Sequence, residues 1–126
     1  MKKIIVSDQA PKPIGPYSQG IAIGNQFYSS GNIAINPATG ELEVGEIQAE
    51  TRLVLNNMKA TVDAAGFTMQ DIVKCTIFIK DMDQFSLINE IYGEYFTETP
   101  PARECVQVAR LPKDVNIEIS CIAVKN

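Results

Sequence analysis

Residues 46–80 read EIQAETRLVLNNMKATVDAAGFTMQDIVKCTIFIK, a helical pattern followed at once by a strand pattern. In the first part, apolar side chains recur at intervals of three and four residues, which is the spacing of one face of an α-helix. Acidic residues open this segment and Gly66 closes it, as is typical of helix termini. The sequence therefore predicts a helix over residues 46–65, with an apolar stripe of Ile47, Val54, Leu55, Met58, Val62 and Ala65.

The second part, Asp71 to Lys80, alternates in the way that a strand does. One predicted face holds Val73, Cys75, Ile77 and Ile79, and the other holds Ile72, Lys74, Thr76, Phe78 and Lys80.

Towards the C-terminus, Asp81 or Asp83 is expected to cap a second helix that runs to about Phe96. Residues 99–101 (Thr-Pro-Pro) stop it. Two closing strands, residues 104–109 and 115–124, are expected to form a hairpin joined by residues 111–114. The apolar stripe of the second helix is Phe85, Ile88, Tyr92, Tyr95 and Phe96.

Towards the N-terminus, residues 3–6 read as a short strand, and the proline-containing residues 8–16 read as a loop. Residues 21–31 predict a hairpin turning at Gly24-Asn25, and residues 36–40 a further turn. The order βββ-α-β-α-ββ indicates an α+β fold with a mixed sheet. The length of 126 residues suits one domain over residues 1–126.

Composition narrows the possible chemistry. The chain has no histidine, which excludes Ser-His and Cys-His nucleophilic sites and the commonest metal ligand. Its net charge of −4 argues against binding to a nucleic-acid backbone. Three cysteines without a zinc spacing, no secretory leader and no apolar run long enough to span a membrane favour reduced thiols and a cytoplasmic protein.

One face of the last strand looks too apolar for open water and too polar for a core. It holds Asn116, Glu118, Ser120, Ile122 and Val124. Because two helices can cover only one face of a sheet, we expect self-association to bury the other. The alternative is an ordinary solvated face with a few exposed apolar residues.

Arg103 and Glu118 are the leading candidates for chemistry. A guanidinium binds a carboxylate through two parallel hydrogen bonds, and a partly buried glutamate can deprotonate water. The predicted closing hairpin would bring the two residues close together. They would suit hydrolysis of a small molecule that carries a carboxylate beside an electrophilic carbon. The alternative for Arg103 is a surface ion pair with Glu98 or Glu104.

Further candidates each have a structural alternative. Cys105 lies two residues beyond Arg103, on the same strand face, and could be a nucleophile or a small buried hydrophobe. We assign Cys75 and Cys121 to the core. The remaining candidates, which could line a cleft or merely pack or face solvent, are Tyr17, Ser30, Gly31 and Asn89.

A set of short segments, in this order, resembles the RidA/YjgF family of reactive-intermediate deaminases. The segments are Ile14-Gly15-Pro16-Tyr17-Ser18-Gln19-Gly20, Phe27-Tyr28-Ser29-Ser30-Gly31, Asn89-Glu90-Ile91-Tyr92-Gly93-Glu94-Tyr95-Phe96, Pro101-Ala102-Arg103-Glu104-Cys105-Val106, Leu111-Pro112 and Ile117-Glu118-Ile119. The resemblance covers about residues 8–124.

The resemblance implies a bacterial chorismate-mutase-like fold and a homotrimer with a central barrel and clefts between subunits. It implies hydrolysis of 2-iminobutanoate and 2-iminopropanoate to 2-keto acids and ammonia, without metal or cofactor, which protects pyridoxal-phosphate enzymes from reactive imines. No membrane or nucleic-acid partner is expected.

The resemblance also implies roles for particular residues. Arg103 matches the arginine that binds the substrate carboxylate, and Glu118 matches the glutamate that positions water. Cys105 matches a position whose backbone contacts the substrate's nitrogen region. Glu104 departs from the usual small or apolar residue, and should point away from Arg103. The positions that match the cleft lining are Tyr17, Ser30, Gly31 and Asn89.

Two other functions stay open. The chain could be a trimeric binder or sensor of small 2-keto acids that needs Arg103 but not Glu118. It could also act on RNA and inhibit translation, although its charge and lack of histidine disfavour this.

Overall fold

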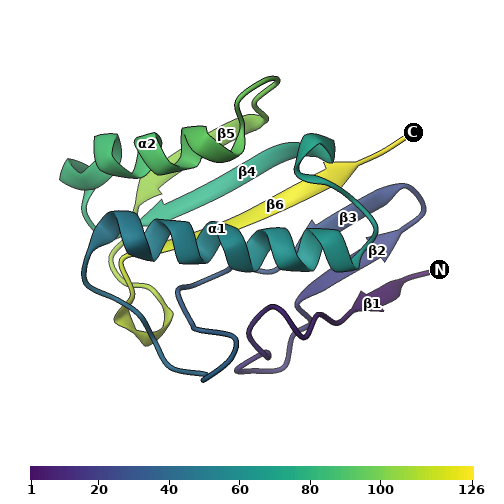
Figure 1. Ribbon diagram of the computed structural model, residues 1–126, viewed down its shortest axis with the longest axis horizontal. Helices are drawn as coiled ribbons and strands as arrows, with labels where there is room; N and C mark the ends of the chain where they lie inside the picture. Colours follow the sequence, from purple (N-terminus) through teal and green to yellow (C-terminus); the bar gives the residue numbers. More distant parts are fainter.

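The computed structural model describes residues 1–126 and shows two α-helices lying against one face of a six-stranded sheet (Figure 1). The predicted α+β class and order of elements are confirmed. Three short 3₁₀ turns, at Met69–Asp71, Met82–Gln84 and Pro112–Asp114, join some of them. In chain order the elements are β1 (Lys3–Ile5), β2 (Gly20–Ile23), β3 (Gln26–Ser29), α1 (Ile47–Ala64), β4 (Ile72–Ile79), α2 (Phe85–Tyr95), β5 (Ala102–Gln107) and β6 (Ile117–Val124).

The strands lie in the order β1-β2-β3-β6-β4-β5, and only β4 and β5 run parallel. The predicted closing hairpin of β5 with β6 is therefore wrong, because β4 lies between them. The distribution of apolar residues explains this order. Alternate residues of β4 and β6 are buried under the helices, which suits central strands, whereas β5 has no fully buried residue and takes the edge.

The predicted faces of β4 hold from Lys74 onwards but are reversed at its start. Ile72 is buried and Val73 is exposed, the opposite of the expected alternation. A shift of register between Ile72 and Lys74 inserts Val73 as an extra residue. A bulge of this kind moves the preceding side chain to the other face of the sheet.

Helix α1 follows its prediction closely. Glu46 caps its N-terminus by accepting hydrogen bonds from the backbone of Gln48 and Ala49, and Gly66 ends the helix with a φ of +82°. Helix α2 starts later than expected, because Asp81 caps the 3₁₀ turn that precedes it, accepting from the Asp83 N–H at 2.9 Å.

Helix α1 also buries polar residues that the apolar stripe did not reveal: Glu50, Thr51, Asn57 and Thr61. Glu50 is completely buried, and its carboxylate accepts hydrogen bonds from the backbone N–H and the side-chain amide of Asn116, both at 2.8 Å. Asn116 immediately precedes β6. The Glu50 carboxylate therefore fixes where β6 begins.

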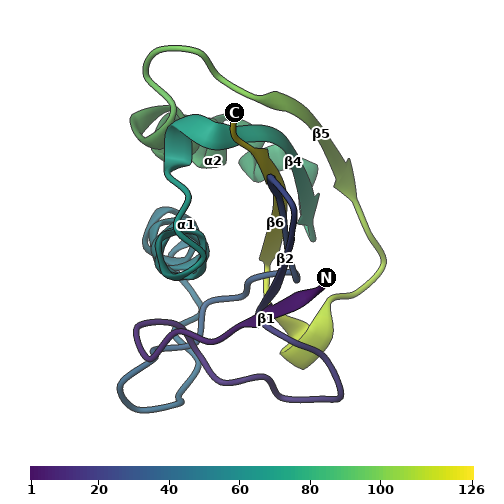
Figure 2. The same ribbon diagram turned by 90° about the vertical axis from the view of Figure 1, so that its right-hand side faces the viewer.

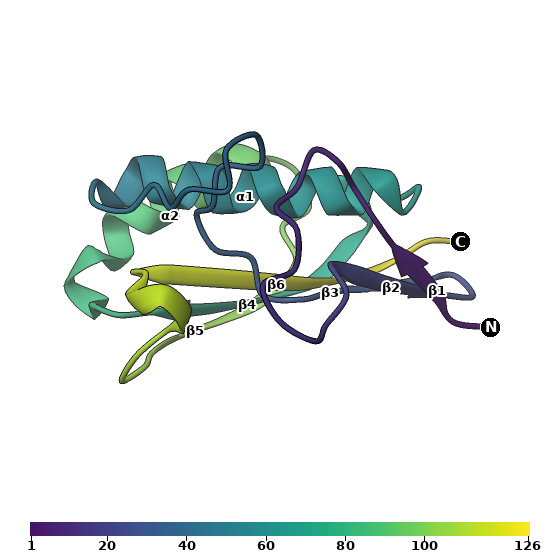
Figure 3. The same cartoon turned by 90° about the horizontal axis from the view of Figure 1, so that it is seen from below.

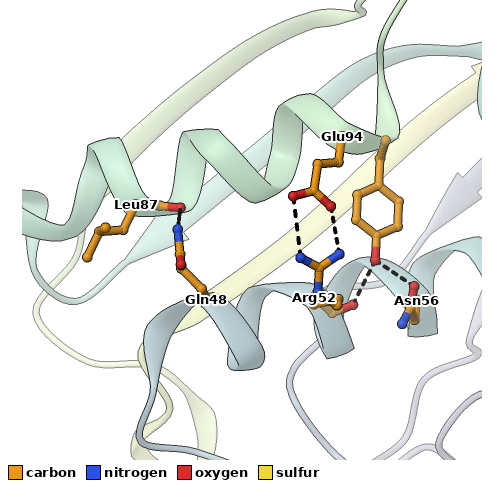
Figure 4. Close-up of polar contacts among 6 residues, drawn as sticks. Gln48, Arg52, Asn56, Leu87 and Glu94 are labelled. Atoms are coloured by element: carbon orange, nitrogen blue, oxygen red, sulfur yellow. Dashed lines mark hydrogen bonds and ion pairs between the residues drawn. The ribbon is translucent and has the colours of Figure 1, made fainter.

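Polar contacts tie α2 to α1 (Figure 4). Gln48 donates to the Leu87 carbonyl at 3.1 Å, and Arg52 pairs with Glu94 at 2.7 Å. The Tyr95 hydroxyl donates to Asn56 at 2.6 Å. These contacts fix the position of α2 relative to α1.

Both α-helices lie on the same side of the sheet. No α-helix covers the opposite side, where the only helical element is the short 3₁₀ turn at Pro112–Asp114 near Glu118 (Figures 2 and 3). The register places several exposed apolar side chains on this uncovered face: Ile4, Ile23, Tyr28 and Val106, each at least 40% exposed. The expected mixed face is therefore present. Neither helix has the length and apolar character needed to cross a membrane.

Candidate active site

The candidate residues form two groups, the first around Arg103. This residue lies on β5 in register with Cys75 of β4, so its side chain points to the side of the sheet that carries the helices. Its Nη1 donates to Asn89 Oδ1 at 2.6 Å, and its guanidinium carbon lies 4.9 Å from the ring centre of Tyr92 and 5.5 Å from that of Phe85. We call Arg103, Asn89, Phe85 and Tyr92 the arginine half-site.

Arg103 has no acidic partner. The ion pairs of the chain all involve other cations. The alternative of a surface pair with Glu98 or Glu104 is therefore wrong. Glu98 accepts a hydrogen bond from Gln70 instead. A half-buried guanidinium with most of its donors unused is suited to binding an anion.

Glu104 points away from Arg103, as expected from strand alternation. Its carboxylate accepts from Thr76 Oγ1 at 3.0 Å and pairs with Lys74 at 3.4 Å. The hydrogen bond from Thr76 and the charge of Lys74 lower the pKa of this carboxyl group. The residue that departs from the family pattern therefore does not neutralise Arg103.

The second group surrounds Glu118, and we call it the glutamate half-site. A cavity of about 220 Å³ holds it, lined by Ile14, Tyr17, Ser30, Gly31, Ile33, Pro112 and Glu118. The Glu118 carboxyl group lies against the Gly31 backbone, so closely that a Cβ at residue 31 would be 2.5 Å from it. Burial raises the pKa of Glu118, and no cation faces it. A carboxyl group in this environment can take a proton from water and later release it.

The other members of the glutamate half-site are held by backbone contacts. Ser30 Oγ donates to the Ser18 carbonyl at 2.6 Å, and the Tyr17 hydroxyl accepts from the Ile14 N–H at 3.1 Å. Ser30 is therefore oriented by the backbone of the loop that precedes β2.

Gln19, which was not among the predicted site residues, anchors the loop that precedes β2. Its side chain accepts from the Ser7 N–H at 2.6 Å and donates to the Pro11 carbonyl at 2.8 Å. The only signal was its place two residues after Tyr17, in one of the segments that resemble the family. A long amide side chain there can satisfy the backbone of a proline-containing loop that joins no sheet.

Cys105 lies on the helix side of β5 with Arg103 and packs partly against the core. Burial raises its pKa, which keeps the sulfur in the thiol form and favours the role of a small hydrophobe. Cys75 and Cys121 are buried in the core, as expected. No group of three or more His, Cys, Asp or Glu side chains is placed to hold a metal ion.

The two half-sites do not meet within one chain. Glu118 lies in register with Phe78, and Arg103 with Cys75, so the two side chains leave opposite faces of the sheet with β4 between them. The expectation that a hairpin would bring them together is wrong. Asn89 lies in the arginine half-site, where it bonds to Arg103, and Tyr17, Ser30 and Gly31 lie in the glutamate half-site.

Comparison with known proteins places the chain in a family. Residues 7–125 match the family described as Endoribonuclease L-PSP. The chain is 51% identical, over 99% of both chains, to the 2-iminobutanoate/2-iminopropanoate deaminase of Escherichia coli. It is 53% identical, again over 99% of both, to a RutC family protein of Pyrococcus horikoshii.

Solved structures agree with this. The structure of Escherichia coli TdcF with bound serine covers 98% of this chain and 99% of its own, at 49% identity and a TM-score of 0.95. The Escherichia coli YjgF gene product covers the same shares at 49% identity and a TM-score of 0.94.

Proposed function

The chain belongs to the RidA/YjgF family, and from that premise we propose that it hydrolyses small 2-imino acids to 2-keto acids and ammonia. The proposed substrates are 2-iminobutanoate and 2-iminopropanoate, the compounds named for the Escherichia coli relative. We propose that this removal of reactive imines protects pyridoxal-phosphate enzymes in the cytoplasm.

One observation carries the proposal: Arg103 and Glu118 are both partly buried, carry opposite charges and have no charged partner within the chain. Burying charged groups without partners costs stability. Such groups are therefore concentrated at functional sites, where a ligand supplies the partner. A 2-imino acid offers both complements, a carboxylate for Arg103 and an electrophilic carbon that takes up water next to Glu118.

Because the two half-sites lie on opposite faces, we propose that each active site combines the arginine half-site of one copy with the glutamate half-site of another. The uncovered apolar face supplies a surface for such assembly (Figure 2). We propose the homotrimer with a central barrel, in the chorismate-mutase-like arrangement that the family resemblance implies.

The proposed reaction moves both protons of one water molecule to the imine nitrogen. Arg103 holds the substrate carboxylate and thereby orients the C=N carbon. Glu118 takes a proton from water as the oxygen adds to that carbon and the C=N π electrons move to nitrogen. Protonated Glu118 then gives this proton to the nitrogen, which leaves a carbon that bears a hydroxyl and an amino group. Glu118 next carries the hydroxyl proton to the amino nitrogen, the C–N bond breaks with its electron pair going to the departing ammonia, and the oxygen electron pair forms the C=O bond. Atoms balance as imine plus water giving keto acid plus ammonia.

The test is release of 2-oxobutanoate and ammonia from 2-iminobutanoate made in situ by a threonine dehydratase, with and without this protein. We expect faster release with the protein and a large loss in Arg103→Ala and in Glu118→Gln. If neither substitution lowers the rate, the proposed function is wrong.

A second candidate is capture of small carboxylates without turnover. The TdcF structure favours it, since the serine bound there has a carboxylate but no imine. This function needs Arg103 and not Glu118, so Glu118→Gln would leave it intact. The family description also names an endoribonuclease, but the net charge of −4 and the lack of histidine weigh against binding and cutting RNA.

A further inference from the structure

Helix α2 presents one face to Arg103. Phe85, Asn89 and Tyr92 are spaced by four and three residues, so they lie on the same side of the helix. Asn89 accepts from one end of the guanidinium, while the two rings lie within 5.5 Å of its central carbon. Three neutral side chains from one helix therefore surround a single cation.

We propose that Tyr92, assisted by Phe85, is a positioning residue that holds the Arg103 guanidinium by its aromatic face and leaves one edge free for the substrate carboxylate. This inference rests on the proposed function. A cation is attracted to the face of an aromatic ring within about 6 Å of its centre, and both contacts meet that limit.

The surroundings of Tyr92 suit this role. Its ring is 6% exposed and packs on Phe96 at 4.7 Å between ring centres, so it has little freedom to move. Burial raises the pKa of its hydroxyl, and the neighbouring Cys75 thiol adds to the effect, so Tyr92 stays neutral. A neutral ring attracts the guanidinium without supplying an anion that would compete with the substrate.

A second arginine shows the contrast. Arg52 is held by the Glu94 carboxylate, also on α2, through two hydrogen bonds of 2.7 and 3.4 Å (Figure 4). Its charge is therefore compensated within the chain. The same helix thus fixes Arg52 with a carboxylate and Arg103 with rings and an amide. Only at Arg103 is there no anion of the chain that competes with a ligand carboxylate.

The Tyr92 hydroxyl supports the inference in another way. It is buried without a hydrogen-bond partner. A buried unsatisfied hydroxyl does not stabilise the fold, so the useful part of the side chain is its ring. Phenylalanine at this position should keep the contact with Arg103, whereas leucine should remove it while still filling an apolar space.

The test measures binding of 2-oxobutanoate, the keto-acid product, by titration calorimetry, together with steady-state hydrolysis of the imine. We expect Tyr92→Leu to weaken binding about 5- to 30-fold, the equivalent of about 1–2 kcal/mol at 1.4 kcal/mol per tenfold, and to raise KM more than it lowers kcat. Tyr92→Phe should retain the affinity.

Two controls separate positioning from general loss of packing. Phe67 is another buried aromatic with a cation over its ring, Lys125 at 4.4 Å, but it is not a neighbour of Arg103. Phe67→Leu should lower Tm without changing the affinity. In an Arg103→Ala background, Tyr92→Leu should have no further effect on binding, because the group that it positions is gone.

Failure of the proposed deaminase function and failure of the positioning role of Tyr92 give different results. Wild-type protein that binds 2-oxobutanoate but does not speed hydrolysis would contradict the deaminase and leave the positioning role standing. Equal affinity in Tyr92→Leu and wild type, equal losses in Tyr92→Leu and Tyr92→Phe, or no binding by wild type would each overturn the role of Tyr92.

Discussion

Arg103 and Glu118 lie on opposite faces of one sheet, on the two strands that flank β4. Arg103 faces α2, and Glu118 faces the cavity lined by Tyr17 and Gly31. No single small substrate can reach both side chains of one chain through the sheet.

Mixing two inactive variants should restore activity if each site is shared between copies. Arg103→Ala and Glu118→Gln protein, unfolded together and refolded as random mixtures of the proposed trimer, should regain about a quarter of the wild-type sites, because half the copies supply each intact half-site. The measurement is 2-oxobutanoate release per mole of protein. Each variant refolded alone is the control, and a mixture no more active than these would contradict a shared site.

Gly31 should be essential for activity and nearly neutral for stability. A Cβ at this position would lie 2.5 Å from the Glu118 carboxyl group, which must then move. We expect Gly31→Ala to lower kcat/KM on the order of 100-fold, the cost of displacing a reacting group by about 1 Å. Tm should change little, since the end of a flexible side chain can give way.

Gly93 in α2 offers the matched control, because nothing lies within 4 Å of a Cβ there. Gly93→Ala should keep the activity and stabilise the protein by about 0.5–1 kcal/mol, since alanine favours the helix. Full activity in Gly31→Ala would show that the position of Glu118 against Gly31 is not needed.

The stability of the protein should depend on pH through Glu118. Burial raises its pKa above the ordinary value of 4.5, so the folded state binds this proton more tightly than the unfolded state. Stability from this group is therefore present below pH 4.5 and is lost as pH rises through the raised pKa. Urea unfolding at fixed protein concentration should show this loss in wild type and not in Glu118→Gln.

Glu104→Gln provides a comparison, because the stability that Glu104 contributes changes with pH in the opposite direction to that of Glu118. The pKa of Glu104 is lowered, so its contribution is present above its unfolded pKa and is lost as pH falls, and it should be small because the group is exposed. Parallel pH curves for wild type and Glu118→Gln would be inconsistent with the raised pKa of Glu118.

The buried Glu50 carboxylate should matter for both stability and activity. Glu50→Ala leaves the Asn116 N–H without a partner, and we expect it to lower the free energy of unfolding by about 2–3 kcal/mol. Since β6 carries Glu118, kcat should fall as well. Glu50→Gln retains one acceptor oxygen, and its stability and kcat should lie between those of Glu50→Ala and wild type. Chemical denaturation and steady-state kinetics measure the two effects, and a fully stable Glu50→Ala would refute this role.

Much of the fold was predictable because it depends on local patterns. The helix over residues 46–65 was found within one residue at each end, since its apolar spacing, its acidic start and Gly66 are all local signals. Six residues of the half-sites were also named as site candidates, because each lies in a segment that resembles the family: Tyr17, Ser30, Gly31, Asn89, Arg103 and Glu118.

Pairing between distant strands was not predictable in the same way. The sequence of β5 and β6 suited a hairpin. In the structure β4, which has more buried apolar residues than β5, pairs with β6, and β5 pairs with the other side of β4 at the edge of the sheet. Glu50 gave no signal because a charged residue within a helix ordinarily faces water. Its partner, Asn116, is distant in sequence.

The amino-acid sequence alone determined the elements and the family and pointed to Arg103 and Glu118 as candidates, because these depend on spacing along the chain. Only the tertiary structure decided that Arg103 rests on α2 against Tyr92, and that Glu118 leaves the sheet on the other side. The reason is that the direction of a strand side chain depends on which neighbours the strand pairs with. That choice is made by burial of the whole sheet and not by any one segment.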